Sequence, residues 1–381
     1  MTLERNVILV LVPVLIFGLL SCGGGQSFTG FPGFKEHFDS YPPSDAVPTA
    51  QEKKLLEEYK PRIFKSAGEP SPVDFYQDYI ASGSLYVEGK KVSDEVTQAI
   101  LNAYRDNPKA LFKYEGDRRS KAKGKAQVYA RIDVEKTKYN HTDYEFTFLT
   151  YNLVFPVSGI VKDIGKIKTT GLAIVGNRDD WHQLDHYVNV SVALLNGQAV
   201  AMTLQQHNYQ TTYFLDPLRP HIAVDIAIRS NELYPHSDKR TMHPAVQFLT
   251  KDNLEFVISH TNKPAFAGYD ITHGEDELSY ELAFLPQTDA FYRFKGSLGK
   301  ERWLPGRSGP PGADYATLPG LMPRHLRMIV GFRTDSVEEE VALYDKLFDA
   351  EKLAIRPHGI HAYKKRFFDS LNAVTNEKQE D

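Results

Sequence analysis

Histidine and aspartate are concentrated in one part of the chain, and this concentration is the first indication of chemistry. Eight of the thirteen histidines fall between residues 182 and 273. The densest group lies in one short segment and comprises Asp180, His182, Asp185 and His186. Imidazole and carboxylate ligands together favour zinc or manganese, whereas oxygen ligands alone favour calcium or magnesium. The segment therefore predicts a divalent-cation site, which His207 joins if its strand lies beside residues 187–195.

The backbone conformation of this segment decides which side chains converge. On a helix, His182 and His186 are four residues apart and share one face, as paired zinc ligands do. On a strand, both histidines point in the same direction as Asp180 and Leu184. The chain has no HExxH motif, so a zinc-protease helix is not indicated. A hydrogen-bonded polar cluster at the start of a strand is the alternative to a metal site.

Composition and missing motifs exclude several other classes of function. The net charge is −4 and the pI is about 6.4, so the chain lacks the basic character of a nucleic-acid-binding protein. A single cysteine excludes a CxxC metal or redox motif. No GxSxG elbow, P-loop or GxGxxG motif is present. The segment 273–276 (His-Gly-Glu-Asp) is interpreted as a polar turn rather than a cation site.

The N-terminus predicts where the protein is located. Residues 7–20 are apolar or small, which is shorter than the roughly 20 residues of a membrane span but typical of a signal peptide. They lead into Leu19-Leu20-Ser21-Cys22, which resembles the bacterial lipobox, in which the cysteine becomes the lipidated first residue of the mature chain. Several acyl chains on one residue, palmitate among them, anchor a protein stably.

The sorting of the predicted lipoprotein depends on the residue after the lipidated cysteine. Gly23 stands there instead of aspartate, which favours the outer membrane by resemblance to the bacterial sorting rule. The predicted location is therefore the bacterial cell envelope, at the outer membrane. An ordinary signal peptide that contains a cysteine is the alternative.

Strands dominate the elements that must position the candidate ligands. Segments rich in Val, Ile, Thr, Tyr and Phe predict strands over residues 127–132, 144–155, 187–195, 200–215, 222–229, 254–260 and 326–332. Many strands separated by turns, with no strand–helix alternation, predict an antiparallel β-sandwich. Helices are expected over residues 51–59, from an N-cap at Ser93 to Arg105, and over residues 336–353 near the C-terminus.

Composition divides the chain into four parts. Residues 1–21 form the predicted signal peptide, and residues 22–50, rich in Gly, Pro and Ser, form the lipidated cysteine with a flexible stalk. Residues 51–365 predict a single β-sandwich domain with peripheral helices, because this length buries a large core. Residues 366–381 form a tail.

Three blocks of sequence resemble one family and occur in its order. Residues 59–76 resemble the opening of the vacuolar-protein-sorting family known by the number sixty-two. Residues 177–192, followed by Gln206-His207, resemble its "gDWEhvtV…sqH" block, and His243-Pro244, followed by His260, resemble its "HPvvyva…sH" block. The second block is related to the GHRHDWE heptapeptide of the necrosis- and ethylene-inducing proteins. The blocks extend over a little more than half of the chain.

The resemblance implies a β-sandwich and, through the necrosis-inducing relatives, a bound divalent cation. In those relatives the Asp and Glu that flank the motif tryptophan hold the cation. The Asp falls on Asp180, the tryptophan on Trp181 and the Glu on His182. In a second alignment the Glu–His pair falls on Asp185-His186.

The other matched positions imply less chemistry. His243 and His260 match family histidines, and each is equally well interpreted as a hydrogen-bonded structural residue. The vacuolar-sorting branch has no well-defined chemical activity to carry over to this chain.

These observations predict a lipid-anchored envelope protein without defined catalytic activity, whose β-sandwich binds an unidentified surface ligand. A divalent cation (Ca, Mg, Mn or Zn) or a polar cluster is expected to shape its loops, and its expected partners are the membrane and that ligand, not nucleic acid. The first alternative is a metal-dependent hydrolase in which Asp180, His182 and His186 hold a cation that activates water. The second is a membrane-active effector like the necrosis-inducing proteins, which a stable lipid anchor disfavours.

Overall fold

The computed structural model describes the middle of the chain, from Ser44 to Gly299 with internal gaps. The described residues are 44–116, 125–139, 141–160, 179, 182–185, 188–206, 209–215, 220–249 and 263–299. The expected signal peptide, most of the stalk, the strands at 254–260 and 326–332, the helix at 336–353 and the tail lie outside them. No helix among the described residues is long and apolar enough to cross a membrane.

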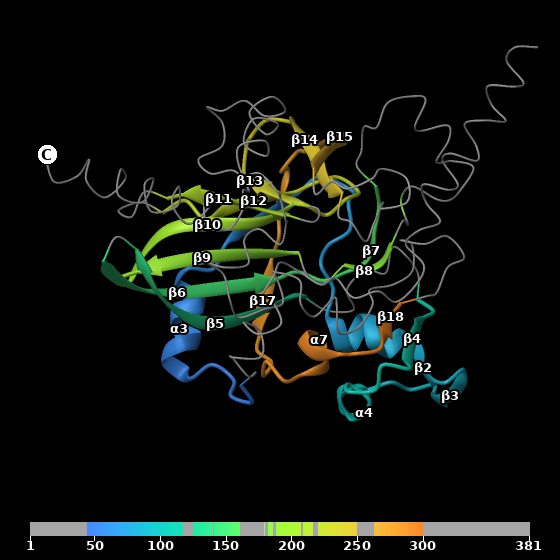
Figure 1. The fold of residues 1–381 in the computed structure, drawn as a ribbon. Coiled ribbons are helices and arrows are strands. Elements are labelled where there is room, and N and C mark those ends of the chain that lie inside the picture. Colours follow the sequence, from blue (N-terminus) through green and yellow to red (C-terminus); the bar gives the residue numbers. More distant parts are fainter. Residues whose placement is uncertain are drawn as a thin grey trace, which may run out of the picture.

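A six-stranded sheet forms the centre of the fold (Figure 1). Its order is β11 (Tyr209–Phe214), β10 (Gln198–Gln206), β9 (Asn189–Leu195), β6 (Thr142–Asn152), β5 (Ala126–Tyr139) and β17 (Tyr280–Ala283). All neighbours are antiparallel except β17, which runs parallel to β5. The expected strand over 200–215 is therefore two strands, which pair with each other as β10 and β11.

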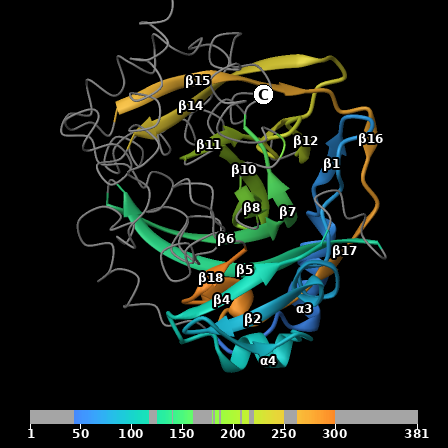
Figure 2. The same ribbon diagram turned by 90° about the vertical axis from the view of Figure 1, so that its right-hand side faces the viewer.

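Four smaller sheets surround the central one. The β1 sheet has the order β13 (Leu233–Pro235), β12 (Ala223–Ile226), β1 (Arg62–Lys65) and β16 (Asp276–Glu277). The β2 sheet has the order β18 (Ser297–Leu298), β4 (Ala110–Tyr114), β2 (Gly83–Val87) and β3 (Lys90–Ser93). Two pairs complete the fold, namely β7 (Phe155–Ser158) with β8 (His182–Asp185), and β14 (Thr241–Leu249) with β15 (Lys263–Thr272). Figure 2 shows β14 and β15 on one side of the central sheet and the β2 sheet on the other.

The central sheet and the β1 sheet enclose the larger hydrophobic cluster. The β1 sheet contributes to this cluster the side chains of Ile63, Val224, Ile226 and Leu233. The central sheet contributes alternate residues such as Val190 and Val192 of β9, as expected for strands with one buried face. Two mainly antiparallel sheets packed over a shared core give the sandwich-like, mainly β fold that the sequence predicts.

A second cluster lies on the side of the β2 sheet. It contains the π-helical turn Phe75–Tyr79, the 3-10 turn Ile80–Ser82, and the helices α4 (Gln98–Ala103) and α7 (Ala290–Arg293). Tyr129 of β5 belongs to this cluster, whereas its neighbours Val128 and Ala130 belong to the first. Strand β5 therefore borders both clusters, because successive side chains of a strand point to opposite faces.

The sequence predicts two helices in this part of the chain, and for the second of them an N-cap at Ser93. Helix α3 (Ala50–Glu58) lies where a helix is expected, and its N-cap Thr49 forms a capping box with Glu52. The prediction of an N-cap at Ser93 is wrong, because Ser93 is the last residue of β3, which pairs with β2. Helix α4 begins at Gln98, and Thr97 caps it by accepting a hydrogen bond from the Ile100 N–H at 3.3 Å.

The end of the expected stalk contacts the folded body. The Ser44 carbonyl accepts a hydrogen bond from the Gln287 N–H at 3.0 Å, and the Ser44 N–H donates to Gln287 Oε1 at 3.2 Å. The Thr288 hydroxyl donates to Asp45 at 2.5 Å. These contacts place the start of α3 beside the α7 side of the molecule.

Candidate functional site

Most of the predicted site residues lie outside the described part of the chain. This holds for the predicted ligands Asp180, His186 and His207, for the family-matched positions Trp181 and His260, and for the lipidation residue Cys22. The backbone of His182 and Asp185 is described as part of β8, but the side chains of these two residues are not. The metal site predicted between residues 180 and 207 therefore stays a prediction.

The backbone of residues 182–185 is extended, which favours the strand interpretation of this segment over the helical one. Strand β8 pairs antiparallel with β7, with Ser158 opposite His182 and Phe155 opposite Asp185. Leu184 is buried in the second cluster and has a φ of 55°. A positive φ interrupts the regular side-chain alternation of a strand. The simple rule that places alternate residues on one face does not apply across Leu184.

An ion pair connects the beginning of this motif to the β12–β13 turn. Arg229 Nε lies 2.5 Å from Asp179 Oδ1, and the Arg229 side chain is largely buried. The turn itself is held against β7, because the Gly159 N–H donates to the Arg229 carbonyl at 2.8 Å. Asn231 Nδ2 also donates to the Val157 carbonyl at 3.0 Å. The motif segment and the β12–β13 turn are therefore neighbours in space.

The outer face of the β1 sheet carries a group of polar and aromatic side chains. Cross-strand partners in a sheet point to the same side. Asp225 pairs with both Phe64 and Tyr234, so these three side chains share the face opposite the hydrophobic cluster. Strands β14 and β15 supply facing polar groups. We call this group the polar layer, and its members are Phe64, Asp225, Tyr234, His236, His243, Asp270 and Thr272.

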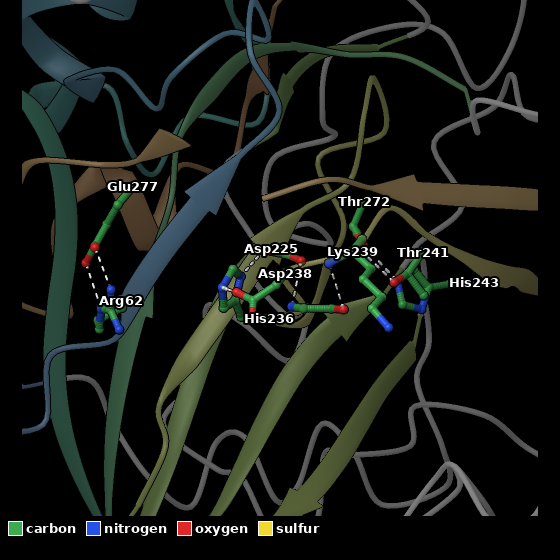
Figure 3. Close-up of polar contacts among 10 residues, drawn as sticks. Arg62, Asp225, His236, Asp238, Lys239, Thr241, His243, Thr272 and Glu277 are labelled. Atoms are coloured by element: carbon green, nitrogen blue, oxygen red, sulfur yellow. Dashed lines mark hydrogen bonds and ion pairs between the residues drawn. The ribbon is translucent and has the colours of Figure 1, made fainter. Parts of the chain in front are cut away.

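A carboxylate–imidazole pair, Asp225 with His236, is the most ordered part of the polar layer (Figure 3). Asp225 Oδ1 lies 2.6 Å from His236 Nδ1, and Asp225 Oδ2 accepts a hydrogen bond from the Ser237 N–H at 3.1 Å. The His236 ring stacks on Phe64 with a centroid distance of 3.7 Å and an interplanar angle of 13°. The contact with Asp225 and the stacking on Phe64 together restrict the position and the rotation of the imidazole ring.

Burial opposes the charge of Asp225, and its partners favour that charge. The Asp225 side chain is 0% exposed, and burial raises the pKa of its carboxyl. The hydrogen bonds from His236 and from the Ser237 N–H act in the opposite direction on this pKa. His236 faces Asp225 with Nδ1 and therefore presents Nε2 away from it. His236 Nε2 lies 3.4 Å from Asp238 Oδ1 on the protein surface.

Gly274 allows the turn between β15 and β16 to cover this pair. A Cβ atom at this position would lie 2.1 Å from Asp225 Oδ1 and 2.9 Å from both His236 Nδ1 and the Phe64 Cβ. Heavy atoms of side chains do not approach this closely, so only glycine fits without displacement. The backbone of residue 274 therefore forms one wall around the Asp225–His236 pair.

The second half of the polar layer is built around His243. Its ring stacks on Tyr234 at 3.8 Å, and its Nε2 lies 3.0 Å from the Thr272 hydroxyl. Tyr234 in turn donates to Asp270 at 2.8 Å, and Ser230 donates to the other Asp270 oxygen at 2.5 Å. Burial lowers the pKa of His243 to about 4, so the imidazole is neutral at pH 7. These contacts fit the structural alternative for His243.

The turn at 273–276 is polar, as the sequence indicates. His273 Nδ1 lies 3.3 Å from Glu275, and Glu275 accepts a hydrogen bond from the Ala67 N–H at 3.0 Å. Beside this turn, Arg62 forms a bidentate ion pair with Glu277, at 2.8 Å from Nε and 2.7 Å from Nη2. In the described part of the chain, no three His, Cys, Asp or Glu side chains converge as a metal-binding group.

Sequence reasoning missed Asp225 and His236. Neither residue lies in a spacing motif, and they are brought together by the β12–β13 hairpin. One signal was present, since Asp225 is the only charged residue in the apolar segment 222–228. A charged residue within an otherwise apolar strand segment indicates a buried partner.

The fold places the chain in the class of mainly β proteins with sandwich-like packing of mainly antiparallel sheets. Comparisons with protein-family models, with curated proteins and with solved structures found no match. The resemblance to the vacuolar-sorting family and to the necrosis-inducing proteins stays a prediction.

Proposed function

We propose that this chain is a lipid-anchored protein of the bacterial cell envelope whose β-sandwich binds a ligand near the polar layer. The single observation that carries the binding role is the polar layer itself. Asp225 and Asp270 are both 0% exposed, and two imidazoles accompany them. Removing charges from water costs several kcal/mol per ion, and apolar residues often stabilise such a layer as well or better. The retention of such a layer supports a role in binding.

The anchor is supported by the Leu-Ser-Cys sequence before Gly23. Cells expressing the full chain, fed with labelled palmitate, are expected to label the protein and to retain it in the outer-membrane fraction. The variant Cys22→Ser is expected to lose the label and to leave the membrane fraction after processing or to stay unprocessed. A labelled Cys22→Ser chain, or an unlabelled wild-type chain, contradicts the anchor.

The predicted cation at Asp180, His182, Asp185, His186 and His207 is part of the proposal and has its own test. The full chain, purified in detergent without chelator, is expected to carry a near-stoichiometric divalent metal by elemental mass spectrometry. The double variant Asp180→Ala/His182→Ala is expected to lose it. The control Asp276→Ala/His221→Ala removes the same residue types from exposed positions and is expected to keep it. Absence of metal after reconstitution contradicts this site.

A metal-dependent hydrolase is the second candidate, and the Asp225–His236 pair favours it. A buried carboxylate on Nδ1 that leaves Nε2 near the surface is the arrangement in which a histidine acts as general base or metal ligand. A screen of ester, phosphoester and peptide substrates, run with zinc present, tests it. Activity that is retained by His236→Gln excludes this histidine from the reaction.

A further inference from the structure

We propose that His236 and Asp238 bind a divalent cation of the zinc class, with Asp225 as the carboxylate that orients His236. This ligand pair shares no residue with the set predicted between residues 180 and 207. It is also independent of the lipid anchor. The proposal deepens the binding role of the polar layer and rests on it through Asp225 and His236, whereas its failure leaves the anchor and the cation predicted between residues 180 and 207 untouched.

The first argument is the orientation of the imidazole. Histidines that bind metal through one ring nitrogen generally donate a hydrogen bond from the other to a carboxylate or carbonyl. Asp225 Oδ1 lies 2.6 Å from His236 Nδ1, inside the protein, so Asp225 stands where such a carboxylate is needed. With Nδ1 engaged by Asp225, Nε2 is the ring nitrogen that faces Asp238 and the surface. Stacking on Phe64 at 3.7 Å restricts rotation of the ring out of this position.

The second argument is the spacing of the two ligand atoms. Zinc binds imidazole nitrogen at about 2.0–2.1 Å and carboxylate oxygen at about 2.0–2.2 Å, usually with tetrahedral angles. Two such ligands of one ion stand about 3.4 Å apart by this geometry. His236 Nε2 and Asp238 Oδ1 are separated by 3.4 Å. The pair thus has the separation of two ligands on one ion without any rearrangement of the backbone.

The third argument is access and charge. The Asp238 side chain is 99% exposed and the His236 side chain is 12% exposed, so an ion reaches the pair from solvent while its other positions hold water. Arg62, the cation on the neighbouring strand, is neutralised by its bidentate pair with Glu277. Glu275 and His273 on the adjoining turn pair with each other. Bound water on an open zinc position is the form that zinc enzymes activate.

Zinc binding to the full chain in detergent, measured by equilibrium dialysis at pH 7, tests the proposal. Wild type is expected to bind one more equivalent of zinc than Asp238→Asn. Asp238→Asn is expected to keep the wild-type urea-unfolding midpoint, because its side chain makes no packing contact at 99% exposure. His236→Gln is expected to lose the same equivalent. Asp225→Asn is expected to weaken it about 10- to 100-fold, the usual effect of a lost outer-shell carboxylate.

Asp276→Asn is the matched control, since it removes a second exposed aspartate of the same region. Asp276 forms an ion pair with Lys65 at 3.4 Å, and its variant is expected to bind zinc like wild type. A site-specific readout accompanies the dialysis. Zinc is expected to slow modification of His236 by diethylpyrocarbonate in wild type and not in Asp238→Asn, as followed by peptide mass spectrometry.

Two outcomes overturn the proposal. One is equal zinc binding by wild type and Asp238→Asn, which leaves His236 as an imidazole held between two carboxylates. The other is an equal loss in Asp238→Asn and Asp276→Asn, which shows unspecific attraction of the cation to surface charge.

Discussion

At the scale of single residues, the polar layer contains two histidines in opposite situations. His236 is paired with a buried carboxylate and points Nε2 to the surface, whereas His243 is enclosed and bonded to a hydroxyl. The first arrangement leaves a ring nitrogen for chemistry, and the second uses its nitrogen for structure. In the sequence, His243 matches a position of the resembled family and His236 matches none. The different environments of the two histidines become visible only in the fold.

His243 gives the stability of the protein a defined pH dependence. Its pKa is about 4 in the native state and near 6.5 in the unfolded chain. The unfolded state therefore binds more protons between these values, and stability falls as the pH decreases from about 6.5 to about 4. The loss amounts to up to roughly 3 kcal/mol.

Urea unfolding of the purified chain at several pH values measures this effect. His243→Phe retains a ring against Tyr234 but has no proton to bind, so its stability is expected to fall less than that of wild type over this range. His221→Phe, which changes an exposed histidine, is expected to keep the wild-type slope. An unchanged slope in His243→Phe contradicts the assignment.

Gly274→Ala is expected to destabilise the protein by about 1–3 kcal/mol, the usual cost of forcing extra atoms into a packed site. The new Cβ would lie 2.1 Å from Asp225 Oδ1. Gly68→Ala is the comparison, because there the Cβ meets no atom within 4 Å and only the positive φ of 79° is strained. Chemical denaturation of both variants decides the point. Equal losses would mean that Gly274 does not close the wall around Asp225.

At the scale of elements, local signals predicted some boundaries and tertiary pairing decided others. Helix α3 lies where the sequence predicted a helix, and its Thr49–Glu52 capping box is contained in four consecutive residues. Ser93 has the same chemistry as an N-cap, yet it ends a strand because β3 pairs with β2. Likewise, the segment 200–215 was expected to be one strand and is two, β10 and β11, with the polar residues 205–208 at the division between them.

The capping box of α3 is expected to contribute about 1 kcal/mol to stability. Thr49 Oγ1 accepts from the Glu52 N–H at 3.3 Å, and Glu52 Oε2 accepts from the Thr49 N–H at 2.7 Å. Thr49→Ala removes the first bond and weakens the docking of Leu56, whose carbonyl accepts from the Tyr151 hydroxyl at 2.8 Å. Thermal unfolding measures the loss. Lys54→Ala, on the exposed side of the same helix, is expected to stay within about 0.5 kcal/mol of wild type.

At the scale of the whole molecule, β5 joins the two hydrophobic clusters. Val128 faces the first cluster and Tyr129 the second, where its ring stacks on Phe291 at 4.5 Å. Its hydroxyl also accepts a hydrogen bond from the Phe75 N–H at 2.9 Å. A strand shared by two clusters couples their unfolding.

Val128→Ala is expected to cost about 2 kcal/mol and to lower hydrogen-exchange protection on both sides of β5. Amides of β9, beside the first cluster, and of β4, beside the second, are expected to lose protection together. Val134→Ala changes the same residue type in the same strand at 53% exposure, and it is expected to have little effect. Lost protection in β9 alone would show that the clusters unfold independently.

The fold class was predictable and the polar layer was not, for one physical reason. The mainly β class follows from periodicity within single strands, such as the alternating valines of β9. The polar layer requires knowing that β1 pairs with β12, and no local pattern reports that pairing. Asp225 and Phe64 are adjacent in the sheet, yet residues 65–224 separate them in the chain.

The position of β1 also determines the order in which the molecule is completed. Strand β1 is the first of the described strands, and its neighbours in the sheet are β12 and β16. As the chain emerges from its N-terminal end, neither of these neighbours is available to β1 until residues 66–222 have followed. Contacts of such long sequence separation form slowly, and an unpaired strand is exposed to aggregation meanwhile. The Asp225–His236 pair can form locally within the β12–β13 hairpin, whereas the stacking of His236 on Phe64 requires the long-range pairing of β1 with β12.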